Sequence, residues 1–283
     1  MAKATTIVEE STGRSAGPTV SLDEAAASPA SKRVLVHELF TTIAPGYDRF
    51  NRLASLSLDQ GWRRRAVALG GVTAGMRVLD VCTGTGDLAL CCARQIGRDG
   101  LVVGLDFTEA MLYGARLKEQ RLTTSKFLQA PASNFQLPAS SFQPLAPSIF
   151  WLNGDAQALP FRDQSFDRVF IGFSTRNLSD LRQGIGEFVR VLKPGGRLVI
   201  LETGRPANPL VRAGYLLFLG TVVRAIGWIV TGRVWPFTYL ARSVKGFLAP
   251  AEFVALINGC GAPAQYIPLS GGLASLYIAQ KPS

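Results

Sequence analysis

The sequence predicts an α/β fold in which a seven-stranded, mostly parallel sheet is doubly wound with helices. Short apolar runs alternate with helical segments from residue 77 onward, which is the pattern of such a sheet. A glycine turn, residues 82–86, directly follows the first of these runs. The 283 residues are 47% hydrophobic, so one large core is expected and global disorder is not.

The N-terminal region contains two segments of different character. Residues 1–30 are rich in Ala, Ser, Thr and Gly with scattered acidic residues, and we expect them to form a disordered tail. They lack the apolar stretch of a signal peptide. The ordered domain is expected over residues 31–283, beginning near Ser31. Residues 31–72 are helical in pattern and precede the first strand, so they form either a lid over a substrate or a brace on the sheet edge.

The remaining elements follow from the alternation of patterns. The expected strands cover residues 77–81, 101–106, 149–152, 166–173, 197–202, 265–269 and 274–279. The expected helices cover residues 87–96, 108–120, 181–192 and 250–258. The last two strands should form an antiparallel hairpin that closes the sheet. Four prolines within residues 121–148 predict a long irregular insertion.

A long apolar stretch lies between the fifth and sixth strands. Residues 213–230 carry a single charge, Arg224, and approach the length of a membrane span. Three glycines and a central arginine make a poor span, because a mid-membrane arginine costs about 2.5–3.5 kcal/mol on insertion scales. We therefore interpret residues 205–245 as an apolar cover over a hydrophobic substrate site, able to touch the bilayer.

Charge and cysteine content limit the classes of partner. The net charge of +10 and the pI of about 9.8 favour a nucleic acid or an anionic membrane as partner, or else describe an ordinary basic enzyme. The basic residues are spread out without interleaved aromatics, which argues against nucleic acid. One histidine and four cysteines without Cys-x-x-Cys spacing predict no metal site. The thiols are interpreted as reduced, in a cytoplasmic protein.

The glycine turn carries the first indication of a ligand. Gly84, Thr85 and Gly86 fit the loose dinucleotide pattern G-x-G-x-x-G/A, which by itself is a weak signal. Asp80 ends the preceding strand, where a cationic amino group can bind. Asp87 follows the turn, and its charge disfavours a pyrophosphate at the helix N-terminus. The turn therefore fits a cationic nucleoside without phosphates, and S-adenosylmethionine is such a molecule.

Two further acidic residues support a nucleoside. Asp106 ends the second strand, where a carboxylate can accept hydrogen bonds from both ribose hydroxyls. Asp155 and Ala156 follow the third strand, at the expected height of the adenine. Each aspartate also suits a helix N-cap, but ligands of such sheets bind at this edge, and three acids at successive strand ends favour a binding site.

The motifs together resemble those of a known family. The chain resembles class I S-adenosylmethionine-dependent methyltransferases with a Rossmann-like fold, and more narrowly the ubiquinone/menaquinone biosynthesis C-methyltransferase family. The resemblance covers residues 34–280. It is carried by Tyr47-Asp48-Arg49-Phe50-Asn51 with Ser55, Trp62-Arg63-Arg64, Leu79-Asp80-Val81-Cys82-Thr83-Gly84-Thr85-Gly86-Asp87, Ala158-Leu159-Pro160-Phe161, Thr175-Arg176-Asn177, the segment 190–197 and Tyr239-Leu240-Ala241-Arg242-Ser243.

The resemblance implies methyl transfer from S-adenosylmethionine to a ring carbon of a polyprenylated quinol, with demethylmenaquinol as the expected substrate and a ubiquinone precursor as a second one. Together with the strand-end acids it places the cofactor on Asp80, Gly84, Thr85, Gly86, Asp106, Asp155, Ala156 and Gly172. The substrate is expected at Tyr47, Asn51, Arg176, Asn177 and Tyr239. The sequence departs from the family pattern at Ser57, Asp59, Gly172 and Gly204.

The expected chemistry needs an electron-rich carbon, so the enzyme must bind the reduced ring and help to remove a proton. The candidates for a base or an orienting group are Tyr47, Asp48 and the lone His37, while Arg176 can stabilise a phenolate. Arg176 in a surface ion pair and His37 in a structural role are the plainer alternatives.

Two other functions stay open from the sequence: a methyltransferase for another small aromatic molecule and a nucleic-acid methyltransferase. The expected location is the cytoplasm, with peripheral contact on the inner face of the plasma membrane, and a homodimer stays open.

Overall fold

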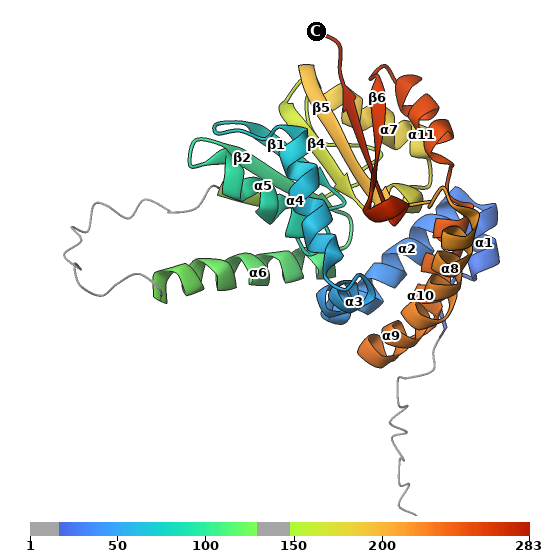
Figure 1. Cartoon of the computed structure of the whole chain (residues 1–283). Helices are drawn as coiled ribbons and strands as arrows, with labels where there is room; N and C mark the ends of the chain where they lie inside the picture. The colour runs from blue at the N-terminus through green and yellow to red at the C-terminus, as the bar shows by residue number, and fades with distance from the viewer. Residues whose placement is uncertain (1–16, 129–147) are drawn as a thin grey trace, which may run out of the picture.

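The computed structural model describes residues 17–128 and 148–283, which form one sheet with helices on both faces (Figure 1). The sheet has seven strands in the order β3-β2-β1-β4-β5-β7-β6. They are β1 (Arg77–Val81), β2 (Leu101–Asp106), β3 (Ser148–Asn153), β4 (Phe166–Gly172), β5 (Leu192–Thr203), β6 (Ala264–Leu269) and β7 (Ala274–Gln280).

Strand pairing confirms the predicted fold class. The strands β1 to β5 are parallel, whereas β7 runs antiparallel to β5 and pairs with β6 in the C-terminal hairpin. In the central strand β1, the residues after Arg77 are buried, as expected where helices cover both faces. The helix and hairpin at the end of the chain therefore close the sheet on one side, with β7 inserted between β5 and β6.

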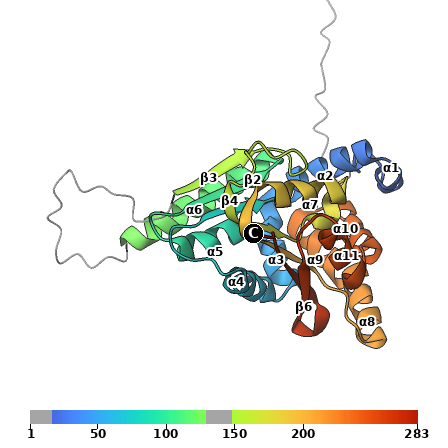
Figure 2. The same ribbon diagram turned by 90° about the horizontal axis from the view of Figure 1, so that it is seen from above.

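Helices cover both faces of the sheet (Figure 2). On one face lie α4 (Leu58–Gly70) and α5 (Asp87–Ile96), which pack with β1, β5 and β7 around one apolar cluster. On the other face lie α7 (Leu181–Val191) and α11 (Pro250–Asn258), around a second cluster. The apolar positions of α4, such as Ala66 and Val67, are almost fully buried against the sheet.

Order begins earlier than residue 31, so the predicted boundary of the tail is wrong. Helix α1 (Leu22–Ala27) and the first turn of α2 (Pro29–Ile43) lie within the range predicted to be disordered. A reciprocal capping box explains α1: Ser21 accepts a hydrogen bond from the Glu24 amide, and the Glu24 carboxylate accepts one from the Ser21 amide. The expectation for residues 1–16 lies outside the described residues.

The helix after β2 also extends further than predicted. Helix α6 (Glu109–Leu128) continues past residue 120 into the range predicted to be irregular. Residues 121–128 contain neither proline nor glycine, and Pro131 is the first helix breaker after them. The rest of the predicted insertion, residues 129–147, lies outside the described residues.

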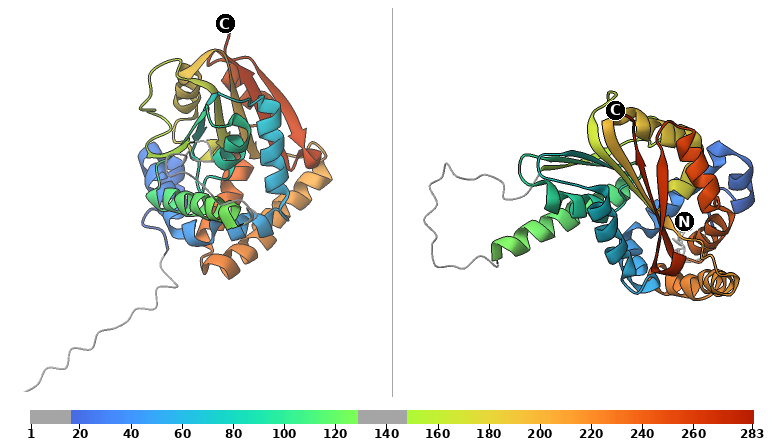
Figure 3. Two further views of the ribbon diagram at one scale, coloured as in Figure 1. Left: turned by 90° about the vertical axis from the view of Figure 1, so that its left-hand side faces the viewer. Right: turned by 45° about the horizontal axis from the view of Figure 1, so that its top comes forward.

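Residues 31–72 combine the two roles that the sequence left open. Helices α2 and α3 (Tyr47–Ala54) lie beyond the carboxyl ends of the parallel strands, together with the orange helices of the apolar stretch (Figure 3). Their buried residues, among them Leu39, Ile43 and Phe50, pack in a third cluster with residues of those helices. Helix α4, by contrast, is a brace on the sheet.

The predicted cover, residues 205–245, corresponds to three helices, α8 (Pro209–Gly220), α9 (Val222–Thr231) and α10 (Trp235–Gly246). The span Pro209–Thr231 is long and apolar enough to cross a membrane, by length and composition alone. Thr221, with φ −121° and ψ −73°, interrupts it between α8 and α9. Leu219, Val223 and Phe237 are buried against α2 and α3, so these helices cover one end of the molecule.

Helices α9 and α10 pack closely because Gly227 has no side chain at their contact. A Cβ atom on Gly227 would lie 2.1 Å from the ring of Phe237, which is buried. We predict that Gly227→Ala lowers the free energy of unfolding by about 1–3 kcal/mol, because the overlap forces the helices apart. Gly214→Ala in α8, where nothing lies within 4 Å, is the control and should not destabilise. Equal urea unfolding midpoints for both variants would contradict the close packing.

Candidate active site

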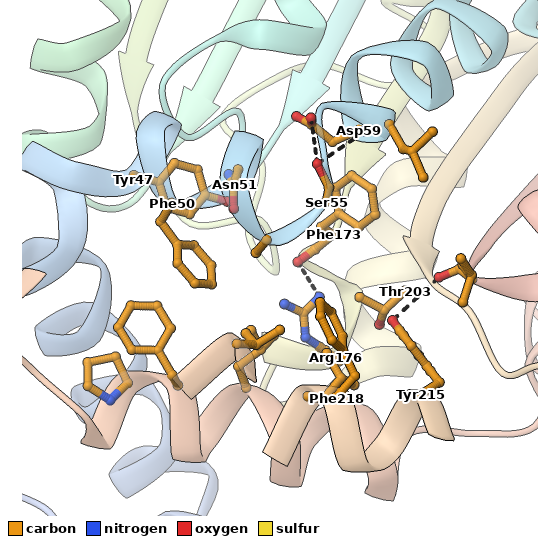
Figure 4. Close-up of a pocket in the computed structure, with 18 of the residues that line it drawn as sticks. Tyr47, Phe50, Asn51, Ser55, Asp59, Phe173, Arg176, Thr203, Tyr215 and Phe218 are labelled. Atoms are coloured by element: carbon orange, nitrogen blue, oxygen red, sulfur yellow. Dashed lines mark hydrogen bonds between the residues drawn. The ribbon is translucent and has the colours of Figure 1, made fainter. Parts of the chain in front are cut away.

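Two neighbouring cavities lie at the carboxyl ends of the parallel strands. The smaller one, the glycine-turn cavity, lies against Gly84 and Asp106. The larger one, the apolar cavity, has a volume of about 450 Å³ and lies between α2, α3, α8 and α10 (Figure 4). Phe40, Tyr47 and Asn177 line both, so the two cavities meet at these three side chains.

The glycine turn bends at three residues with left-handed backbone angles, namely Cys82, Gly84 and Gly86, whose φ values are 53°, 57° and 80°. Glycine adopts this region without strain, whereas a cysteine rarely does. Asp106 holds the turn by accepting hydrogen bonds from the amides of Gly84 (2.8 Å) and Thr108 (2.9 Å). Burial raises the pKa of the Asp106 carboxyl to about 6. Cys82 packs against the core and also lines this cavity.

Four of the eight residues predicted to bind a cofactor line the glycine-turn cavity: Gly84, Asp106, Asp155 and Ala156. Asp155 forms an ion pair of 2.5 Å with Arg33 of α2, a cavity residue that the sequence did not single out. Burial opposes ionisation of Asp155, but hydrogen bonds from the Gln157 amide and from Arg33 hold its pKa below the ordinary value. Helix α2 thus closes this cavity from the side opposite the sheet.

Asp80 does not line either cavity. It is buried beneath the turn, where its carboxylate accepts hydrogen bonds from the Thr83 hydroxyl (2.5 Å) and the Ala89 amide (2.9 Å). Burial raises the pKa of Asp80 to about 7. Its neighbours indicate a role in shaping the turn and the start of α5 rather than direct contact with a cationic amino group.

Thr85, Gly86 and Gly172 also lie outside the lining of both cavities. A Cβ atom on Gly86 would lie 2.5 Å from the ring of Trp151, so this glycine permits close packing of the turn on β3. The Thr85 hydroxyl donates to Asp48 (2.5 Å) and accepts from Lys118 (3.0 Å). The turn is therefore bound to the helices around it as well as to the sheet.

Two of the base candidates face away from the cavities. His37 is exposed on α2, and its ring packs edge-on against Phe107 with centroids 5.5 Å apart. Asp48 forms an ion pair with Lys118 (2.8 Å) and accepts from Thr85. Helix geometry explains this: neighbouring residues of α3 point in different directions, so Tyr47 faces the cavities while Asp48 faces α6. The predicted catalytic roles of His37 and Asp48 are therefore corrected, because neither lines a cavity.

All five predicted substrate residues line the apolar cavity: Tyr47, Asn51, Arg176, Asn177 and Tyr239. Figure 4 labels the first three. They come from α3, from the short 3₁₀ turn after β4 (Thr175–Asn177) and from α10. The Tyr239 hydroxyl donates to the Asn177 side-chain oxygen at 3.3 Å. Most of the remaining lining is aliphatic or aromatic, so a few polar groups project into an otherwise apolar space.

Arg176 is held in a buried ion pair, so its interpretation as a surface pair is wrong. Its guanidinium donates to Glu202 at 2.6 Å and to the Phe173 carbonyl at 2.5 Å. Glu202, which is fully buried at the end of β5, also accepts from the Thr175 hydroxyl at 2.6 Å. Glu202 was not among the predicted site residues, although an acid at the end of a parallel strand was the signal that identified Asp106.

Two buried donors at this position have no protein partner among the described residues: Nε of Arg176 and Nδ2 of Asn177. An unpaired buried donor is costly unless a ligand or water accepts from it. The tyrosines beside them stay protonated at neutral pH, because burial raises the pKa of Tyr47 and raises those of Tyr215 and Tyr239 to about 12. The polar part of the apolar cavity thus combines buried donors without a protein partner and protonated tyrosines.

Comparisons with known proteins agree with this geometry. The model of the ubiE/COQ5 methyltransferase family matches residues 28–146 and 143–281. The chain belongs to this family. A demethylmenaquinone methyltransferase of Deinococcus radiodurans is 39% identical over 87% of this chain and 92% of its own length. A demethylmenaquinone methyltransferase of Desulfitobacterium hafniense is 35% identical over 90% of this chain and 93% of its own length. A ubiquinone/menaquinone biosynthesis C-methyltransferase of Geotalea uraniireducens is 36% identical over 87% of this chain and 96% of its own length.

Solved structures support the fold. A methyltransferase dependent on S-adenosylmethionine (SAM) from Thermotoga maritima superposes with a TM-score of 0.55 at 17% identity, covering 86% of this chain and 98% of its own. Another SAM-dependent methyltransferase, from Aquifex aeolicus, superposes with a TM-score of 0.54 at 18% identity. The superposition covers 82% of this chain and 97% of the other. The Rossmann-like methyltransferase fold predicted from the sequence is thereby confirmed.

The structure accounts for two of the departures from the family pattern. Asp59 is buried and binds Arg63 and the Ser55 hydroxyl within α4 and the preceding turn. At Gly204, a Cβ atom would lie 1.9 Å from the Gly272 carbonyl oxygen, so any side chain there would need a displaced backbone. Both substitutions therefore fit the local packing of this chain.

The buried ion pair gives a stability prediction. Glu202→Gln should lower the free energy of unfolding by about 3 kcal/mol, because Arg176 then keeps an uncompensated charge inside the protein. Asp163→Asn, which removes a carboxylate that pairs with Arg190 at the surface, is the matched control and should cost less than about 1 kcal/mol. Chemical denaturation of both variants measures the difference, and equal losses would show that the Arg176–Glu202 pair contributes little.

Proposed function

We propose that the protein transfers a methyl group from SAM to a ring carbon of a prenylated quinol, with demethylmenaquinol as the substrate. The observation that carries this proposal is the junction of the two cavities at Phe40, Tyr47 and Asn177. A cofactor in the glycine-turn cavity and an aromatic ring in the apolar cavity would meet there. The names of the curated relatives support the choice of a quinone as the ring.

The residues of the glycine-turn cavity fit SAM. Asp106 presents a carboxylate suited to ribose hydroxyls, and Asp155 can accept from the adenine amino group. Arg33, a cation of this lining, is paired with Asp155, so the cavity suits a nucleoside without phosphates better than a pyrophosphate. When bound, SAM supplies an electrophilic methyl group on a sulfonium. Gly84 and Ala156 leave room for the nucleoside.

The apolar cavity suits the reduced quinone ring and the start of its tail. A hydroquinone is a better carbon nucleophile than a quinone, and more so when a phenol proton is lost. The unpartnered Nε of Arg176 and Nδ2 of Asn177 can donate to a quinol oxygen and stabilise the developing phenolate. Tyr47 stays protonated and acts as an orienting donor at the junction. Excluding water and holding the ring in place supply much of the acceleration.

The test is methylation in vitro. Purified protein with SAM should methylate a prenylated demethylnaphthoquinol under reducing conditions, adding one methyl group by mass spectrometry, and should not methylate the oxidised quinone. Asn177→Ala should lower kcat/KM about 10- to 100-fold, because one donor to the ring oxygen is lost. Asn258→Ala, which lines neither cavity, is the control. Binding of the cofactor without methylation of any quinol would reject the proposal, and equal turnover of an unprenylated aromatic would favour another small-molecule substrate.

We further propose that the molecule docks on the inner face of an anionic membrane through the cover. Exposed apolar side chains lie on α8 and α9, among them Leu217, Trp228 and Ile229. Residues 203–251 contain five arginines and one lysine but no acidic residue. Leu56 and Val211 line the apolar cavity and are also exposed, so its mouth lies on this surface. Such a surface combines apolar insertion with attraction to anionic lipid.

Liposome flotation tests this surface. Binding should be strong on vesicles with anionic lipid, weak on neutral ones, and reduced when salt rises from about 0.1 to 0.5 M, since screening shortens the reach of the arginines. Trp228→Ser should weaken binding, whereas Phe150→Ser should not. The two side chains are 58% and 59% exposed, but Phe150 lies on the edge strand β3. Equal effects of the two variants would place the membrane contact elsewhere.

A further inference from the structure

Lys118 of α6 joins three parts of the site that are distant in sequence. Its ammonium lies 2.8 Å from Asp48 of α3, 2.5 Å from Asp87 at the start of α5, and 3.0 Å from the Thr85 hydroxyl in the glycine turn. The Lys118 and Asp87 side chains are each only 16% exposed. Ion pairs shielded in this way are stronger than pairs at the open surface.

Lys118, Asp48 and Thr85 form a closed set of contacts, because each of the three side chains contacts the other two. Thr85 donates to one carboxylate oxygen of Asp48 at 2.5 Å, while Lys118 contacts the other. Asp87 also accepts from Gln60 of α4 at 3.0 Å. Burial opposes ionisation of Asp87, but Lys118 and Arg63 together hold its pKa below the ordinary value. Lys118 is therefore the cation that lets two carboxylates lie close together at this point.

Asp48 directly follows Tyr47, the tyrosine at the junction of the two cavities. The Tyr47 ring lies over the glycine turn, 3.8 Å from the position that a Cβ atom on Gly84 would take. Through the backbone of α3, the position of Tyr47 thus depends on where Asp48 is held. None of Lys118, Asp48 and Asp87 lines a cavity, so their influence on a reaction must be indirect.

We propose that Lys118 is a positioning residue that fastens α3 to the glycine turn and so holds Tyr47 between the cofactor and the methyl acceptor. The proposal rests on the proposed methyltransferase function for the identity of the ligands only. Removing the lysine leaves Asp48 and Asp87 facing each other, and their repulsion drives α3 away from the turn. Removing the charge of Asp48 as well abolishes that repulsion.

The experiment compares Lys118→Met, Lys118→Arg, Asp48→Asn and the double variant Lys118→Met/Asp48→Asn in the full chain. The first readout is trypsin cleavage after Arg49 and Arg52, two exposed residues of α3 whose cleavage reports local opening. The second is the dissociation constant of S-adenosylhomocysteine by calorimetry. The third is kcat and KM with a reduced quinol. Lys193→Met, which breaks an ion pair with Asp167 far from both cavities, is the matched control.

We expect Lys118→Met to increase cleavage in α3 and to lower kcat at least about fivefold, with Lys118→Arg close to the parent protein. The double variant should be cleaved more slowly and turn over faster than Lys118→Met, a non-additive result that a general loss of stability does not produce. Lys193→Met should change neither. Unchanged cleavage of Lys118→Met, or additive losses in the double variant, would overturn the proposal. Cleavage and cofactor binding need no methyl acceptor, so these results stand apart from a failure of the quinol assay.

Discussion

The parallel alignment of five strands places the whole candidate site. All of these strands end at the same edge of the sheet, and the chain must leave each of them there through a loop. Asp106, Asp155, Arg176 and Glu202 lie at or just after four different strand ends, although up to 96 positions of sequence separate them. Since the sheet core is rigid, the polar groups that these loops carry are held in fixed relation.

Charge inside the site is balanced in local groups. Arg176 keeps its charge when buried. The Glu202 carboxylate compensates this charge through a contact with Nη1 of Arg176. Arg33 balances Asp155, and Lys118 balances Asp48 and Asp87. The buried donors left without a protein partner beside the apolar cavity are Nε of Arg176 and Nδ2 of Asn177 among the described residues.

The cover of the apolar cavity is built from two parts of the chain that are far apart in sequence. Helices α2 and α3 come before the sheet, and α8, α9 and α10 are inserted before its last two strands. Phe50 and Phe237 join them, with ring centroids 4.4 Å apart. Because the inner faces of these helices pack on each other and the outer faces remain apolar, the same segments can enclose a hydrophobic ligand and contact a lipid surface.

The sheet, the antiparallel hairpin, the position of the cover and the family could be predicted from the sequence, because they depend on periodicity and short motifs. The family resemblance also identified five of the polar residues that line the apolar cavity. The fold was needed to show which acids line the glycine-turn cavity: Asp106 and Asp155 do, whereas Asp80 and Asp48 bind protein partners away from it. Side-chain direction and pairing across Arg33, Lys118 and Glu202 arise from contacts between distant segments, and no local pattern encodes them.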